Sequence, residues 1–255
     1  MTHLRYDELP GGVGKTAAVE ARLAASVIVV RPGRVDEGGR RPDEGVSQAR
    51  FEVLMIRRHE RASFAPNAWV FPGGAVDDLD HEIAREHGSD TLLGARRVAA
   101  VRELFEEAGL WLGAPLYHAE QKRRRLLAGE MSFRDLLAAA PVDFYQLVWT
   151  SHWITPVGMP KRFDTYFFLA RASEDAVATP ENSEAVEVAW ISPADALARH
   201  AAWEFEIVFP TFKNLEALGG FDSIAGLLAS REGARIPAMQ PVIVVEGGQK
   251  KIVLP

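Results

Sequence analysis

Three glutamates with helical spacing stand out in residues 102–110. At about 100° per residue, Glu103, Glu106 and Glu107 fall on one face of a helix. Carboxylates three or four residues apart repel one another, and Gly109 predicts a helix end at which the helix dipole also disfavours acids. A divalent cation would turn this repulsion into attraction, because Mg²⁺ prefers hard oxygen ligands. A metal site therefore competes here with a simpler interpretation, a solvated acidic face on an amphipathic helix.

The residue order in this segment resembles the signature of the Nudix hydrolase superfamily. That signature reads Gly, five residues, Glu, seven residues, then Arg-Glu-apolar-x-Glu-Glu-x-Gly-apolar, and its last nine positions match residues 102–110. Upstream, Phe71-Pro72-Gly73-Gly74 follows an apolar run and supplies the glycine. The family binds Mg²⁺ or Mn²⁺ on this helix and hydrolyses a nucleoside diphosphate linked to another group. The resemblance thus implies a metal-dependent pyrophosphatase.

The spacing departs from the family pattern in one place. Gly74 and Arg102 are 28 positions apart, twice the family distance. Counted forward from the glycine, the first acid of the signature is Asp80, whereas counted back from the arginine it is Gly94. We therefore predict an insertion at about residues 78–92 and leave the identity of this acid open.

The resemblance also implies roles for individual residues. Glu103 and Glu107 are expected to bind the metal directly. Glu106 is expected to bind it either directly or through a bound water molecule, and the Gly74 carbonyl is expected to complete the protein ligands. Arg102 is expected to pair with a helix carboxylate and hold its rotamer. These assignments give Arg102, Glu103 and Glu107 as the catalytic set. The general base stays open between three carboxylates: Glu107, Glu184 and Glu187.

The flanking segments are similar to one subgroup, the long-insert Nudix proteins related to the peroxisomal coenzyme A diphosphatases of animals. Residues 61–74, 153–156 and 162–168 carry this resemblance, which runs from about residue 50 to 218. It implies coenzyme A or acyl-coenzyme A as substrate and 3′,5′-ADP and 4′-phosphopantetheine as products. ADP-ribose, NADH and dinucleoside polyphosphates are alternative substrates. A non-catalytic, nucleotide-sensing Nudix domain is the alternative of another class.

Three further residues are candidates for substrate binding, each with a structural alternative. Arg162 has the planar donor pair that suits a phosphate, including the 3′-phosphate of coenzyme A. With Asp164 it could instead form an ion pair beside a turn. Trp69 could stack on a base, although a tryptophan on a strand more often belongs to the core.

The elements that must position these residues alternate between strands and helices. Alternating apolar runs predict the strands, Gly-Gly at 73–74 predicts a loop, and Ser132 and Ser192 predict helix N-caps. Such a mixture favours an α/β protein, and the Nudix resemblance implies an α/β/α sandwich with a mixed sheet and helical insertions. The expected strands are 26–30, 51–56, 69–71, 149–155, 162–170 and 185–191, with helices near 210–218 and 222–231, a hairpin at 242–254 and a mobile loop at 33–49.

No internal repeat or linker divides the chain, so we expect a single elaborated Nudix domain over residues 1–255. Its core should span about residues 22–218. Helical insertions are expected at about 78–92 and 115–147, and C-terminal helices and a hairpin at about 219–255.

The composition limits the class of protein. The 255 residues are 47% hydrophobic, lack cysteine and carry a formal net charge of −6. Mixed charges argue against broad nucleic-acid binding, and the basic run Lys122-Arg123-Arg124-Arg125 is read as a solvated helix face. No apolar run approaches a membrane span and the first residues lack a signal-peptide pattern, so we expect a cytoplasmic protein without membrane contact. Its expected partner is a small nucleotide substrate, and a homodimer is compatible with the sequence.

Overall fold

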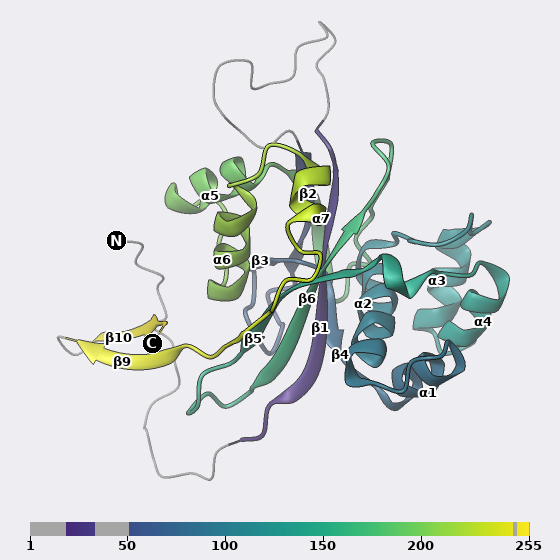
Figure 1. Ribbon diagram of the computed structural model, residues 1–255, viewed down its shortest axis with the longest axis horizontal. Coiled ribbons are helices and arrows are strands. Elements are labelled where there is room, and N and C mark those ends of the chain that lie inside the picture. The colour runs from purple at the N-terminus through teal and green to yellow at the C-terminus, as the bar shows by residue number, and fades with distance from the viewer. Residues whose placement is uncertain (1–18, 34–50, 247–248, 255) are drawn as a thin grey trace, which may run out of the picture.

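The computed structural model describes residues 19–33, 51–246 and 249–254 (Figure 1). Nearly all of the expected loop at 33–49 lies outside these ranges. Within them, a mixed sheet runs through the middle of the molecule, with helices on both sides (Figure 1). This arrangement confirms the expected α/β class and the sandwich of helices around a mixed sheet.

The sheet is organised around β1 (Arg22–Pro32), whose residues 24–31 are buried. Burial on both faces requires the continuous apolar run that the sequence has here. Parallel to β1 lies β6 (Phe163–Arg171). On its other edge, β1 pairs antiparallel with two different strands: β2 (Phe51–Arg58) at residues 30–32 and β4 (Gly73–Ala75) at residues 24–26. This split edge brings the glycine segment beside the N-terminal half of β1.

The remaining strands extend the sheet on both sides. Next to β6 lies the antiparallel β5 (Val148–Ile154), which pairs in turn with the short parallel β8 (Ala238–Met239). On the other side, β2 pairs antiparallel with β3 (Trp69–Val70) and with β7 (Ala185–Ile191). The resulting path is β3-β2-β1-β6-β5-β8.

Two groups of helices cover the two faces of the sheet (Figure 1). On one side lie α1 (Asp78–Glu86), α2 (Leu92–Ala108), α3 (Ala119–Leu127), α4 (Phe133–Ala139) and the 3₁₀ turn Phe144–Gln146. On the other side lie α5 (Pro193–Ala201), α6 (Phe209–Leu218) and α7 (Ile224–Ala229). Alternate residues of β1 enter two separate cores: Val27 and Val29 pack toward α2, whereas Ile28 and Val30 pack toward α6 and α7.

Most predicted elements are confirmed, including the antiparallel pairing of β5 with β6 and the strand at 185–191. Ser132 and Ser192 cap α4 and α5 as expected, each accepting a hydrogen bond from the backbone N–H three residues on. The predicted loop at Gly73-Gly74 is wrong, because both glycines pair with β1 as part of β4. The strand β8 was not predicted, since two residues carry no periodicity.

The C-terminal hairpin is also confirmed: β9 (Val242–Glu246) pairs antiparallel with β10 (Gln249–Val253) and forms a sheet of its own. Among the described residues, no helix combines the length and the apolar character needed to cross a membrane.

Candidate active site

The helix α2 carries the three glutamates in its last two turns. It begins after Thr91, whose hydroxyl accepts a hydrogen bond from the Gly94 N–H, and it ends at Gly109. Gly109 has φ 66°, and its N–H donates to the Phe105 carbonyl. This left-handed conformation favours glycine, which explains why the helix stops directly after the glutamates.

The glycine strand β4 lies against this helix so closely that side chains are excluded. A Cβ atom on Gly74 would lie 2.4 Å from the Glu103 carboxylate, and one on Gly73 would lie 2.3 Å from the Ala25 carbonyl. The Gly73 N–H donates to Glu107 Oε2 at 2.8 Å. Gly74 therefore allows β4 to approach Glu103 of α2, and Gly73 allows it to approach β1 while its N–H reaches Glu107.

Arg102 connects α2 to α1. Its Nε and Nη2 donate to the two carboxylate oxygens of Asp80 at 3.0 and 2.9 Å, and Asp80 is fully buried. Its Nη1 contacts Glu103 at 2.8 Å and Glu106 at 3.3 Å. Of the two positions considered for the first acid of the signature, the structure thus brings Asp80 to Arg102, whereas Gly94 lies in the first turn of α2.

The electrostatics of the site are those of carboxylates held together out of water. Burial raises the pKa of Glu103 to about 7, although the Arg102 charge acts in the opposite direction. Burial also raises the pKa of Glu107 well above its usual range, and the charge of Glu103 raises it further. Glu106 has a raised pKa because of burial, again opposed by Arg102. The simpler interpretation of a solvated acidic face is therefore wrong for Glu107, which is 3% exposed.

This donor set has the chemistry that suits a hard divalent cation. Glu107 is buried and Glu103 is largely shielded from water, and the charge of Glu103 raises the pKa of Glu107, a cost that a bound cation would remove. Arg102 partly neutralises Glu103 and Glu106. Within the described ranges, no three His, Cys, Asp or Glu side chains are gathered into a ready-made metal cage. The carboxylate oxygens are the donor type that a divalent cation prefers. The charges of Glu103 and Glu107 are not fully balanced by Arg102, so these two residues are the better candidates for ligands.

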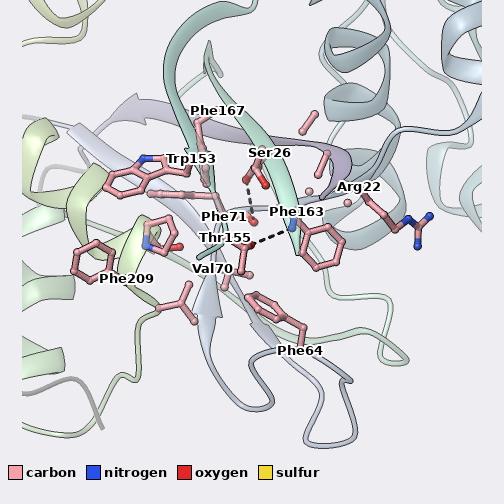
Figure 2. Close-up of a pocket in the computed structure, with 18 of the residues that line it drawn as sticks. Arg22, Ser26, Phe64, Val70, Phe71, Trp153, Thr155, Phe163, Phe167 and Phe209 are labelled. Carbon is pink, nitrogen blue, oxygen red and sulfur yellow. Dashed lines mark hydrogen bonds between the residues drawn. The ribbon is translucent and has the colours of Figure 1, made fainter. Parts of the chain in front are cut away.

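A cavity of about 460 Å³ opens beside these carboxylates. At one end it is lined by Glu103, Gly73 and Gly74. The opposite walls are aromatic and apolar, and Figure 2 shows their side chains converging from several elements. These walls include Phe64, Phe71, Trp153, Met159, Phe163, Phe167 and Phe209. The arrangement can hold a ligand that is anionic at one end and apolar along the other.

Two more polar residues line the same cavity: Arg58, which the sequence did not single out, and Glu184, one of the three open candidates for the general base. Arg58, the last residue of β2, lines the cavity. Its Nε donates a hydrogen bond to the Phe64 carbonyl at 3.1 Å, and the structure gives its other nitrogens no partner among the described residues. Its charge also acts on Glu107. Of the two additional candidates for the general base, Glu184 lines the cavity, whereas Glu187 is half exposed and paired with Arg57 at 2.9 Å. A strand-end arginine beside an apolar run carries no distinctive sequence signal.

The predicted substrate contacts of Arg162 and Asp164 are not supported by the structure. Arg162 donates from Nε to the carbonyls of Thr155 and Pro156 and from Nη1 to that of Val19. Asp164 accepts hydrogen bonds at 2.7 Å from Arg96 and from His152.

Strand alternation explains this outcome. Phe163, Thr165 and Phe167 of β6 line the cavity, so Asp164 between them faces the side of α2.

Trp69 belongs to the core, which corrects its candidacy as a base-stacking residue. It is 5% exposed and stacks on Phe205, with ring centroids 4.2 Å apart. Trp153 is 4% exposed and packs edge-on against Phe209, and it forms part of the cavity wall. The aromatic surface available to a ligand is therefore that of Trp153 and the phenylalanines.

The basic run on α3 is not uniformly solvated, contrary to expectation. Arg123 is 2% exposed. Its Nε donates to the Glu106 carbonyl at 2.9 Å, and its Nη1 donates to the Thr179 carbonyl at 2.9 Å. The Thr179 N–H in turn donates to the carbonyl of Ala108. Arg123 thus satisfies the C-terminal end of α2, where carbonyls lack partners and a positive charge is favourable.

Comparison with known proteins gives relatives along most of the chain. The model of the NUDT19 Nudix domain family matches residues 85–218. The chain is 28% identical to the acyl-coenzyme A diphosphatase NUDT19 of Gallus gallus, over 81% of this chain and 70% of the relative. It is 31% identical to the putative nudix hydrolase 7 of Caenorhabditis elegans, over 65% of this chain and 55% of that protein.

Solved structures agree with the fold. A NUDIX hydrolase from Alicyclobacillus acidocaldarius superimposes with a TM-score of 0.70 at 26% sequence identity. The match covers 84% of this chain and 97% of that one, so the two proteins share their architecture over most of this chain.

Proposed function

Because the chain belongs to the NUDT19 Nudix domain family, we propose that it is a metal-dependent hydrolase that cleaves the diphosphate of coenzyme A or an acyl-coenzyme A. The products would be 3′,5′-ADP and 4′-phosphopantetheine or its acyl derivative. The observation that carries the proposal is the cavity, which is lined by Glu103 of α2 and by aromatic and apolar side chains.

Each part of such a substrate has a counterpart in the cavity. The diphosphate would lie at the end formed by Gly73, Gly74 and Glu103, with Arg58 as the nearby cation. The acyl or pantetheine arm would lie along Phe163, Phe167 and Phe209. Burial of apolar surface contributes about 25 cal/mol per Å², so this wall favours acylated substrates over ligands that carry a second polar nucleotide.

The glutamates would act through the cation that they hold. Nudix hydrolases use divalent cations, and we propose Mg²⁺ or Mn²⁺ at Glu103 and Glu107, with Glu106 and the Gly74 carbonyl in supporting positions. Such a cation supplies the positive charge that diphosphate hydrolysis requires and makes water more acidic. Arg102 orients Glu103 through its 2.8 Å contact, and the Gly73 N–H fixes one oxygen of Glu107.

For the general base we propose Glu184 rather than Glu187. Glu184 lines the cavity, whereas Glu187 does not and is paired with Arg57. Glu107 stays a second candidate through its raised pKa. Glu184→Gln should lower kcat about a hundredfold, whereas Glu187→Gln should change kcat less than threefold.

The central experiment combines a substrate panel with two helix variants. Purified protein with Mg²⁺ or Mn²⁺ is offered coenzyme A, acyl-coenzyme A, ADP-ribose, NADH and a dinucleoside polyphosphate, and product masses are recorded. Glu103→Gln and Glu107→Gln should each reduce turnover at least a hundredfold in folded protein, because each removes a charged metal ligand.

The outcomes test separately the substrate, the catalytic activity and the metal-binding helix. Preference for ADP-ribose or NADH would overturn the coenzyme A assignment and leave the hydrolase assignment intact. Nucleotide binding without turnover of any panel member would indicate a sensing domain. Wild-type turnover in folded Glu107→Gln would reject the metal helix itself.

A further inference from the structure

A second cavity, of about 320 Å³, lies between β5, α6 and the segment that leads from α7 to β8. Its walls include Lys213, Arg231 and Arg235, and among the described residues that line it none is acidic. This local excess of positive charge is unusual in a chain whose formal net charge is −6. Lys213 is paired with Glu216 at 2.7 Å. Within the described parts of the chain, neither Arg231 nor Arg235 has a carboxylate at ion-pair distance.

Two buried hydrogen-bond donors on the walls of this cavity have no acceptor. The indole Nε1 of Trp153 and the Nε of Arg231 are buried, and neither finds a hydrogen-bond partner in the described structure. A buried donor without an acceptor costs about 1–3 kcal/mol, so a ligand that supplied acceptors to both donors would recover this cost. In Figure 2 the indole nitrogen lies on the ring edge turned away from Phe209 and Thr155, which line the first cavity.

From this charge and these donors we propose that the second cavity binds an organic phosphate monoester. A phosphate monoester offers three acceptor oxygens and close to two negative charges near neutral pH. A carboxylate offers only two acceptor oxygens and one negative charge, so it would neutralise the charges of Arg231 and Arg235 less completely. The other walls, among them Ile28, Leu218 and Met239, are apolar and suit the organic part of the ligand better than free inorganic phosphate.

The two cavities share Trp153 as a common wall. A phosphate that accepts the Trp153 N–H would hold the same ring that borders the aromatic side of the first cavity. Hydrolysis of a diphosphate linkage by water produces two phosphate monoesters, so the enzyme's own reaction supplies this ligand class. That last link rests on the proposed function, whereas the site itself does not.

The test is calorimetric binding to the metal-free full chain in EDTA, with phenyl phosphate as the probe. Benzoate serves as the carboxylate of similar shape, and inorganic phosphate as the anion without an apolar part. Phenyl phosphate should bind at least tenfold more tightly than either. Arg235→Gln and Arg231→Gln should each weaken phenyl phosphate binding at least tenfold, because each removes a charge-assisted contact. Trp153→Phe keeps an aromatic ring, loses the N–H donor, and should also weaken it.

Two control variants locate the binding. Arg125→Gln removes an exposed arginine on α3 and should leave the affinity unchanged. Glu103→Gln alters the first cavity and should also leave it unchanged. Absence of binding, or binding that is lost in Glu103→Gln and retained in Arg231→Gln and Arg235→Gln, would overturn the proposal. Because binding is measured without metal or turnover, failure of the hydrolase assignment would not affect this result.

Discussion

Asp80 and Arg102 form a buried bidentate ion pair that joins α1 to α2, the helix that carries the site glutamates. Asp80 also accepts a hydrogen bond from the Asp77 N–H at the start of α1. The same guanidinium contacts Glu103 and Glu106, and it donates to the Ala75 carbonyl of β4. One arginine thus links α1, the glycine strand and the candidate metal ligands.

Asp80→Asn should therefore destabilise the protein by about 3 kcal/mol or more, because it leaves a buried arginine without its main counter-charge. Asp77→Asn is the matched control. Asp77 is 3.7 Å from the same guanidinium but 61% exposed, and asparagine caps a helix as well as aspartate does. Chemical denaturation should show a loss below about 1 kcal/mol for this control. Equal losses in the two variants would show that the buried pair has no special role.

The α2 part of the site could be predicted from the sequence because its signals are local. Helical spacing places Glu103, Glu106 and Glu107 together, and Gly109 marks the helix end. The strand β4 could not be predicted in this way, because three residues carry no periodicity. It exists only through pairing with β1, where Ser26 lies opposite Gly73.

The direction in which individual side chains point could not be predicted from the sequence either. Alternation implies that Arg162 and Asp164 share one face of β6 and Phe163 the other, but it does not say which face meets a ligand. Likewise, four consecutive basic residues on α3 give no sign that Arg123 alone turns inward, because its partners, Glu106 and Thr179, come from distant segments.

Arg58→Gln should lower kcat/KM by about ten- to a hundredfold, because a lost charge-assisted contact to phosphate is worth roughly 1.5–3 kcal/mol. Arg57→Gln is the neighbouring control. Arg57 pairs with the half-exposed Glu187 and does not line the cavity, so its effect should stay below threefold. Steady-state kinetics on the preferred panel substrate measure both. A larger effect from Arg57 than from Arg58 would remove Arg58 from the phosphate site.

Arg123→Ala should cost about 2–3 kcal/mol of folding free energy, because the buried carbonyls of Glu106 and Thr179 lose a charged donor. Arg124→Ala, one residue along α3, removes a side chain that is 77% exposed and paired only with Glu120. Its effect should remain within about 0.5 kcal/mol. Thermal and denaturant unfolding compare the pair directly. Arg123→Lys should recover only part of the loss, since an ammonium cannot donate in two fixed directions. Full recovery would show that charge alone matters.

The metal-free protein should lose stability as the pH rises from about 4.5 to about 7, because burial raises the pKa of Glu103 from 4.5 to about 7. In this range the folded state holds a proton that the unfolded chain has released, so the free energy of unfolding falls with increasing pH. One pKa unit corresponds to about 1.4 kcal/mol, so the rise from 4.5 to about 7 sets an upper limit of about 3.5 kcal/mol for this residue.

Denaturant unfolding in EDTA at several pH values measures this slope. Glu103→Gln should make the slope shallower, because glutamine has no proton to release, whereas Glu187→Gln at a half-exposed position should leave it unchanged. Millimolar Mg²⁺ should raise stability more at pH 8 than at pH 5, because the cation binds only the ionised carboxylates and competes with protons for them. Parallel slopes for wild type and Glu103→Gln would show that Glu103 is ionised in the folded protein throughout this range, and the case for a cation at this carboxylate would lose its electrostatic basis.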